Sequence, residues 1–210
     1  KALLFIYKEK DNIWINPFIL QPIEKKIYPH NEQYYDIETA YGYGGPLSNS
    51  ESIEFLLLAQ KNYEEWCKNK NIIAEFIRFH PLFNNQKFYS KNTKIIFNRK
   101  TVSLNLKKFN INNPPFDTKV RNMIKKVDKQ NIKISIIKSK KFYNDFVQIY
   151  INKMKKISAD KYYYFNKNYF ENLLKLISKN GWFIGATLND KLIGGSILLK
   201  GQNHFHYHLS

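Results

Sequence analysis

Residues 36–45, DIETAYGYGG, bring carboxylates, tyrosines and three glycines together in one short stretch. Asp36 and Glu38 alternate along a predicted strand, so their side chains share one face of it. Either carboxylate there is able to accept the proton of an attacking amine, which makes Glu38 a candidate catalytic base and Asp36 a substrate contact. Carboxylates on a solvated strand face would give the same pattern.

The glycines suggest a second kind of chemistry. Gly42, Gly44 and Gly45 are interleaved with Tyr41 and Tyr43 directly before a predicted helix. Bare backbone N–H groups at such a position can receive a phosphate or another anion, and tyrosine rings can stack on a base, a sugar or an acyl chain. A tight turn whose glycines supply only positive φ is the alternative.

Histidines and an arginine stand on two other predicted strands. Arg78 and His80 lie two residues apart and are expected either to line the same crevice as the carboxylates or to form a structural ion pair. His204, His206 and His208 alternate on the last strand. Side chains at this spacing diverge, which argues against a metal site.

We instead consider His206 and His208 as candidate catalytic residues beside a reacting carbonyl, with Tyr207 as a substrate contact. The competing interpretations are a polar, barrel-like edge strand or buried histidines whose hydrogen bonds are satisfied.

A basic helix and an aromatic turn complete the candidate residues. Arg121 and Lys125 are one helical turn apart and can hold a phosphate together. A solvated amphipathic helix would look the same. The stretch KYYYF at 161–165, with Tyr164 as a candidate substrate contact, either closes over substrate or plugs two helices.

Alternating and helical apolar spacings predict the elements that position these residues. A capping box at Ser48 and Glu51 predicts the start of the first helix, and Asp117 predicts the start of another. The prolines of 112–115 predict a break. The predicted elements are a hairpin at 2–23, strands at 34–39, 72–83, 94–98, 101–106, 132–139 and 203–210, helices around 53–66, 118–127, 142–157 and 169–177, and a hairpin at 182–201.

The order strand, two helices, hairpin and strand in residues 132–210 resembles the front of a GNAT-type acyltransferase domain. Two such units joined by a basic helix resemble the Fem family of aminoacyl and acyl transferases and the related GNAT-like acyltransferases of bacterial surface-polymer synthesis. The motifs that carry the resemblance are DIETAYGYGGPL (36–47), FIRFHPLF (76–83), VRNMIKKVDKQNIKI (120–134), FVQIYINKMKKISADKYYYFNKNYFENL (146–173) and HYHLS (206–210).

The resemblance implies an α/β (α+β) fold with mixed sheets and two truncated units. The first, 1–113, would lack its opening part; a basic helix, 114–131, would connect it to the second, 132–210, which would lack its closing part. In a GNAT domain the loop and helix after the fourth strand hold the coenzyme A pyrophosphate, and residues 41–45 take that place in the first unit. The usual glycine-rich Arg/Gln signature of that loop is not visible in residues 1–210.

The function implied is transfer of an acyl or aminoacyl group to an amine of a cell-envelope precursor, either a peptidoglycan peptide or an amino sugar. The donor would be acyl-CoA or aminoacyl-tRNA, with no metal, and the acceptor would be linked to a nucleotide or a lipid. The expected location is the cytoplasm, with peripheral association at the inner face of the membrane, and no DNA partner is expected. The alternative is a non-enzymatic basic RNA-binding or scaffold module with a degenerate GNAT fold.

Composition limits these possibilities only loosely. The net charge of +17 favours phosphate-bearing partners, but only three of the 34 basic residues are arginine, and a bias toward lysine and asparagine produces a solvated surface of the same charge. The single cysteine, Cys67, gives no intrachain disulfide. Because the chain starts at Lys1 and ends in a strand pattern, we expect it to be a piece of a longer protein.

Overall fold

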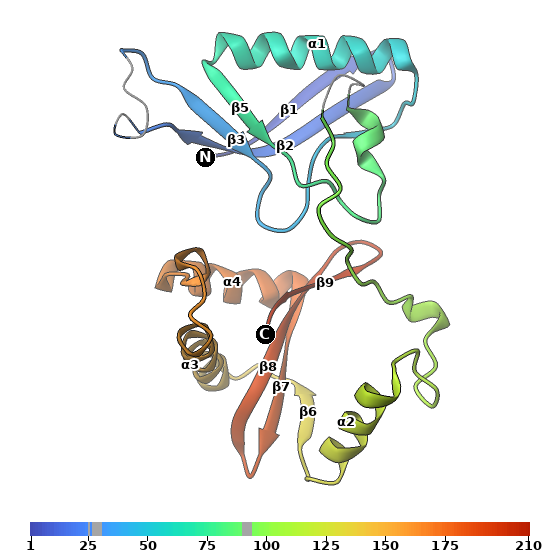
Figure 1. Cartoon of the computed structure of the whole chain (residues 1–210), viewed down its shortest axis with the longest axis vertical. Coiled ribbons are helices and arrows are strands. Elements are labelled where there is room, and N and C mark those ends of the chain that lie inside the picture. The colour runs from blue at the N-terminus through green and yellow to red at the C-terminus, as the bar shows by residue number, and fades with distance from the viewer. Residues whose placement is uncertain (25, 27–30, 90–93) are drawn as a thin grey trace. The chain divides into compact units, whose positions relative to one another are not determined.

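The computed structural model describes residues 1–24, 26, 31–89 and 94–210 (Figure 1). The chain forms two compact units, Lys1–Ser103 and Leu104–Ser210. Each has a β-sheet and at least one long helix, so the mixed α/β class predicted from the sequence is confirmed. Among the helices of the described residues, none combines the length and the apolar character needed to cross a membrane.

Unit 1 is built around a mixed sheet. The hairpin of β1 (Ala2–Glu9) and β2 (Asn12–Pro22) continues antiparallel into β3 (Tyr35–Glu38), and β5 (Ile72–Phe76) pairs with β3 in parallel. The two-residue β4 (Leu47–Ser48) pairs with β2. Helix α1 (Ile53–Asn69) makes the crossover between β3 and β5, as parallel neighbours require.

Helix α1 covers one face of this sheet. Alternate residues of β2 face the helix, and the apolar stripe of the helix packs against them. The sheet and the helix therefore form a two-layer core. Rings stack and tilt against each other throughout it, as in the pair Tyr63 and Trp66. The buried apolar members of this core are Trp14, Phe18, Ile37, Phe55, Ala59, Tyr63 and Phe88.

Three predictions for residues 1–113 are wrong. Helix α1 begins at Ile53 and is capped by Ser52, whose side chain accepts from the Phe55 N–H; the predicted cap, Ser48, is instead held in β4 by pairing with Trp14. The strand predicted over 72–83 ends at Phe76. Residues 94–105, predicted to hold two strands, contain no regular element, and 106–108 form the short turn η2 (Leu106–Lys108). An apolar run becomes a strand only where another strand offers hydrogen bonds.

Unit 2 has an antiparallel sheet in the order β6-β7-β8-β9. Along the chain come α2 (Thr118–Asp128), β6 (Lys133–Ile136), α3 (Lys140–Lys156), the turn η3 (Lys161–Tyr163), α4 (Lys167–Asn180), β7 (Gly181–Leu188), β8 (Lys191–Lys200) and β9 (Phe205–Leu209). The predicted helices and hairpin of this region are confirmed.

Polar caps and apolar stripes explain the helices of unit 2. Asp117, Ser139 and Asn166 each accept a hydrogen bond from the third residue on, which fixes where α2, α3 and α4 begin. Helices α3 and α4 bury their apolar stripes against the same sheet. Their core consists of Tyr143, Phe146, Tyr150, Met154, Phe170, Leu173, Ile177, Phe183, Ile197 and Leu209.

Candidate functional site

The glycine loop of unit 1 lies where two parallel strands end. Beyond β3 the Thr39 N–H donates to the Phe76 carbonyl over 3.1 Å, and the Gly44 N–H donates to the Arg78 carbonyl over 2.9 Å. Because β3 and β5 are parallel, their carboxyl ends meet at one edge of the sheet, where α/β proteins commonly bind ligands. The structure thus brings the predicted residues 41–45 and 78–80 together.

A buried amide, which the sequence did not single out, holds this arrangement. The Asn85 Nδ2 donates to the Gly44 carbonyl over 2.8 Å and to the Pro46 carbonyl over 3.1 Å, while its Oδ1 accepts from the His80 N–H over 2.9 Å. Asn85 stands at the start of the turn η1 (Asn85–Phe88) and is 1% exposed. One side chain therefore fixes the loop against the segment that follows β5.

The rings at this edge are held in contact with one another. Tyr43 meets His80 edge to face at 5.8 Å between centroids, and His80 stacks on Phe83 at 3.8 Å. The His80 Nδ1 accepts from the Leu82 N–H over 3.2 Å, so the neutral ring carries its proton on Nε2. Tyr43, His80 and Phe83 therefore form one cluster of rings at this edge of the sheet.

The glycines differ in what they do. Gly42 and Gly45 have φ of 108° and 88°, a conformation that favours glycine. A Cβ on Gly45 would lie 2.9 Å from the Ile77 Cγ2 and 3.0 Å from the Phe79 Cδ1, so this glycine is required by the fold of the loop itself. The Gly44 N–H already donates to Arg78. Gly45 therefore serves the turn, and Gly44 does not offer its N–H to an anion.

The candidate carboxylates lie on the other face of the sheet from α1. Ile37 is buried in the α1 core, and its neighbours Asp36 and Glu38 point the opposite way. They line a shallow hollow of ≈ 170 Å³ together with Gln21 and Phe76, and the Gln21 amide donates to the Glu38 carboxylate. The hollow is smaller than the roughly 300 Å³ of an ordinary ligand pocket, so it suits a small group such as one amine.

A polar cluster on the face of the sheet that α1 covers was not predicted from the sequence. The Glu75 Oε1 accepts from the Tyr63 hydroxyl over 2.8 Å and from the Asn16 Nδ2 over 3.0 Å, and its Oε2 accepts from Tyr89. Much of Glu75 is exposed on the edge strand, but its carboxylate lies among these side chains, and loss of hydration raises its pKa above the ordinary value. The only sequence signals were single polar residues inside the apolar runs IWINPF and IIAEFI.

In unit 2 a β-bulge positions the candidate histidines. Leu198 pairs with Tyr207 whereas Ile197 pairs with Leu209, so His208 is an extra residue in β9. The bulge lets His208 and Leu209 both face the helices. The Tyr169 hydroxyl of α4 lies 2.7 Å from the His208 Nε2, and Leu209 is in the core. Tyr169 was not predicted, because nothing in its helical spacing distinguishes it from a packing residue.

The surroundings of the two histidines keep them neutral. Burial lowers the pKa of His208 to about 4, with His206 adding to the effect, and burial also lowers the pKa of His206. Their rings lie 5.9 Å apart. Tyr207 pairs with Leu198 on the opposite face and is 60% exposed. The structure therefore brings His206, His208 and Tyr169 together and places Tyr207 apart from them.

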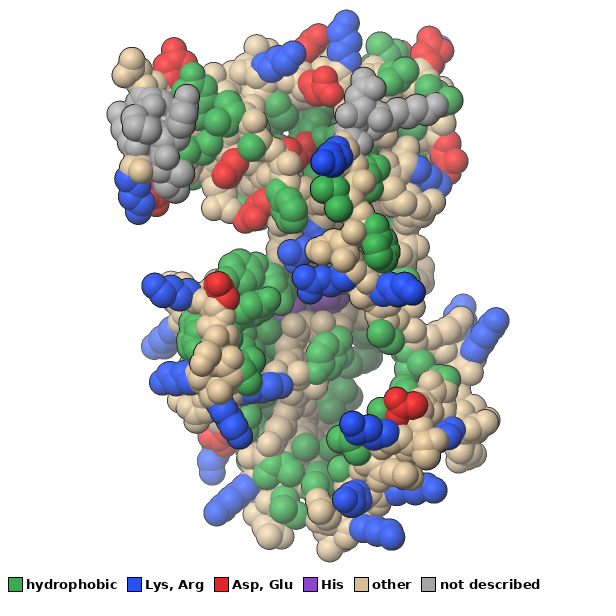
Figure 2. All heavy atoms as spheres, viewed as in Figure 1, with side chains coloured by type: hydrophobic (Ala, Val, Ile, Leu, Met, Phe, Trp, Pro, Cys, Tyr) green, Lys and Arg blue, Asp and Glu red, His purple; other side chains and the backbone are tan. Residues whose placement is uncertain are grey.

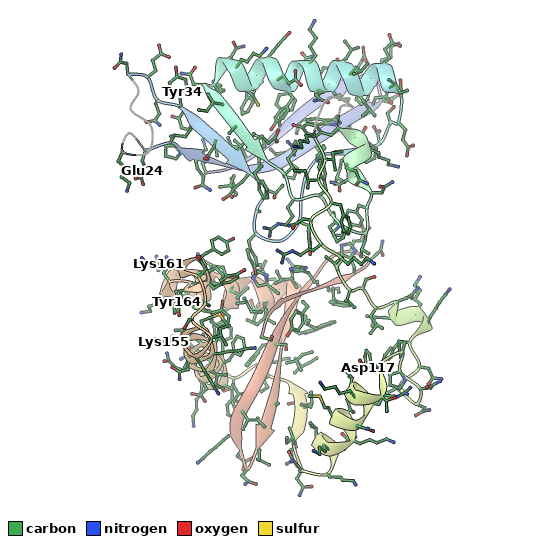
Figure 3. The ribbon with its side chains drawn as sticks, viewed as in Figure 1. Glu24, Tyr34, Asp117, Lys155, Lys161 and Tyr164 are labelled. Atoms are coloured by element: carbon green, nitrogen blue, oxygen red, sulfur yellow. The ribbon has the colours of Figure 1, made fainter. Side chains whose placement is uncertain are left out.

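The remaining candidates lie on α2 and near η3. The Arg121 Nη2 donates to the Thr118 Oγ1 over 3.3 Å, one turn earlier in α2. Asp117 stands at the start of this helix (Figure 3). Tyr164 directly follows η3 (Figure 3) and is exposed. Its neighbour Phe165 stacks on Tyr169 at 4.1 Å. Within this aromatic turn, Phe165 packs between α3 and α4, whereas Tyr164 is accessible.

In comparisons with known proteins, no protein-family model matches the sequence, and no curated protein matches it.

Proposed function

We propose that this chain belongs to an acyl- or aminoacyltransferase built from two GNAT-like units, which forms an amide on an amine of a cell-envelope precursor. The observation that carries the proposal is a repeated meander. β1-β2-β3 and β7-β8-β9 are each a hairpin followed by a third antiparallel strand.

The elements around each meander support the proposal. In unit 2 a strand and two helices, β6, α3 and α4, precede the meander, as in the front of a GNAT domain. In unit 1 a glycine loop, α1 and the parallel strand β5 follow it, which is where the donor-binding part of a GNAT domain is expected. Unit 2 thus contains the elements that precede the meander in a GNAT domain, and unit 1 contains those that follow it. Both units contain the meander itself.

The proposed reaction is attack of an amine nitrogen on an activated carbonyl. A C–N bond forms, and the C–S bond of an acyl-CoA or the C–O bond of an aminoacyl-tRNA breaks. The amine loses its proton to a base, and the leaving sulfur or oxygen takes up a proton. Glu38 is the proposed proton acceptor, because its carboxylate lines a hollow of a size that admits an amine.

His208 has a different proposed role. With a pKa of about 4 it is neutral at physiological pH and is a weak base toward an ammonium group. The His208 Nε2 is engaged by the Tyr169 hydroxyl and its Nδ1 is buried, so the proposed role of this neutral ring is to fix the Tyr169 hydroxyl beside a carbonyl whose oxygen becomes negative. His206, whose pKa burial also lowers, lies beside it at 5.9 Å between ring centroids.

Phosphate groups are common to all the proposed partners. Coenzyme A, tRNA and nucleotide- or lipid-linked precursors each carry them, and Arg121 and Lys125 on α2 are the proposed contacts. The proposed location is the cytoplasm, at the inner face of the membrane, where envelope precursors are assembled.

The test is donor binding by the 210-residue chain. We expect saturable binding of either an acetyl-CoA analogue or tRNA, and a weaker affinity with a smaller salt slope for Arg121→Gln/Lys125→Gln. Lys155→Gln/Lys156→Gln, on the last turn of α3, makes the same charge change and should leave affinity nearly unchanged. Equal losses in the two variants would show a diffuse basic surface, as the RNA-binding or scaffold alternative predicts.

A further inference from the structure

Helix α2 carries an apolar stripe that its own unit does not cover. Val120, Met123, Ile124 and Val127 follow the spacing of one helical face. All of α2 is described, and none of its residues is buried; Met123 is 59% exposed and Ile124 is 43% exposed. The core of unit 2 is formed by α3, α4 and the sheet. Helical stability usually comes from packing such a face, so this stripe requires an occupant.

The segment before α2 also exposes apolar side chains. Leu104, Leu106 and Ile111 are exposed, Ile111 at 81%. Phe109 and Phe116 pack at 6.1 Å between ring centroids, which keeps this segment folded toward the start of the helix. Residues 104–129 therefore form one surface, called the α2 surface below, with apolar side chains on both the turn and the helix.

The α2 surface is also strongly basic. It contains seven Lys or Arg and two Asp, and one of these, Asp117, is engaged in capping the Val120 N–H over 2.8 Å. The helical period places Lys119 and Lys126 on one side of the apolar stripe and Arg121 on the other. In Figure 2 Lys and Arg side chains stand out around exposed hydrophobic side chains in the region of α2. Solvation explains the charges but not the apolar stripe between them.

We propose that the α2 surface docks onto an anionic lipid bilayer, with the apolar stripe at the acyl boundary and the flanking cations among the headgroup phosphates. A helix with an aliphatic face and a lysine-rich polar face is the form that binds in the interface plane. Long Lys and Arg stems reach headgroups while their base lies beside apolar atoms. Single-stranded RNA would require rings on which bases stack, whereas the two rings of the α2 surface, Phe109 and Phe116, pack on each other and the stripe of α2 is aliphatic. This inference does not depend on the proposed transferase activity.

The test is co-sedimentation of the 210-residue chain with vesicles of phosphatidylcholine containing one part in three of phosphatidylglycerol. We expect binding to these vesicles, little binding to phosphatidylcholine alone, and a loss of affinity as salt is raised. Met123→Ser/Ile124→Ser removes apolar area without changing charge and should weaken binding roughly tenfold or more. The control Ile53→Ser/Leu57→Ser removes a similarly exposed i,i+4 pair from α1, 65% and 55% exposed, and should bind like the parent chain.

Equal vesicle affinity of the parent chain and Met123→Ser/Ile124→Ser would overturn the proposal. So would binding to a single-stranded RNA that is unaffected by the Ser variant, together with no binding to vesicles. An environment-sensitive dye on Ile124→Cys, in a Cys67→Ser background, gives an independent measurement. Its emission should shift to the blue when phosphatidylglycerol vesicles are added, and an unchanged emission would count against docking even if the Ser variant were poorly folded.

Discussion

The Tyr169 hydroxyl lies 2.7 Å from the Nε2 of His208 and joins α4 to the bulge of β9. This contact is available only because the extra residue in β9 allows His208 and Leu209, neighbours in sequence, to face the helices together. It puts a neutral histidine at the end of the sheet with a fixed ring orientation.

The first prediction concerns pH. The pKa of His208 is about 4 in the folded chain, below the ordinary value of 6.5, so between these two pH values the unfolded chain binds more protons than the folded one. The stability of unit 2 should therefore fall as pH is lowered from about 6.5 to about 4. Thermal unfolding followed across this range should show melting temperatures that decrease by several degrees.

The comparison uses His208→Gln, which can still bond to Tyr169 but does not titrate. The difference in melting temperature between parent and variant should shrink as the pH falls, because only in the parent does unfolding release an imidazole that then binds a proton, which stabilises the unfolded chain. A difference that stays constant from pH 7 to pH 4 would show that His208 is not held neutral.

The second prediction concerns the clamp on the glycine loop. Asn85→Ala leaves two carbonyls and one N–H without the partner they have in the parent chain. We expect the free energy of unfolding to fall by about 2–4 kcal/mol, since each unsatisfied buried group costs about 1–3 kcal/mol. Denaturant unfolding measures this, with the exposed Asn98→Ala as control. A loss below about 0.5 kcal/mol would mean that the loop holds its shape without Asn85.

The third prediction separates two glycines. Gly45→Ala meets Ile77 and Phe79 at a φ of 88° and should destabilise unit 1 by about 2 kcal/mol or more. Gly194→Ala, on β8, would meet nothing within 4 Å and should be nearly neutral. Both variants add one methyl group, so their melting temperatures are directly comparable. Similar values for the two would contradict the geometry described for the loop.

The fourth prediction concerns Glu75. Tyr63 and Tyr89 donate to different oxygens of the Glu75 carboxylate. Glu75→Gln replaces one of these acceptor oxygens by an NH2 donor, so one of the two tyrosines loses its acceptor. We expect a loss of about 1–3 kcal/mol in the free energy of unfolding. Glu65→Gln on the exposed side of α1 is the matched control and should change stability by less than about 0.5 kcal/mol. Equal effects would show that Glu75 is an ordinary surface carboxylate.

Local patterns were sufficient to predict much of this fold. The turn at Asp11 and the apolar alternation of residues 2–20 identified β1 and β2, and Asp117 identified the start of α2. These elements depend on the nearest few residues. The two strands predicted in 94–106 failed because an apolar run does not reveal whether a partner strand exists.

The site was less predictable for the same reason. The sequence indicated the glycine loop and the alternating histidines, but it contained no sign that Asn85 would reach Gly44 across 41 residues. Nor did it indicate that His208 would be an extra residue in its strand, since a bulge is defined by the partner strand. Glu75 and Asn16 stood out only as polar residues in apolar runs, and their contact depends on how α1 packs on the sheet.

The measurement that tests the transferase proposal most directly is formation of an amide. The 210-residue chain would be incubated with labelled acetyl-CoA, or with labelled aminoacyl-tRNA, and with amino-sugar and muropeptide acceptors that carry a free amine. We expect label in a product stable to mild base from one of the two donors, at a rate that Glu38→Gln lowers by about 10²-fold or more without changing the melting temperature. Folded chain that forms no such product from either donor would contradict it.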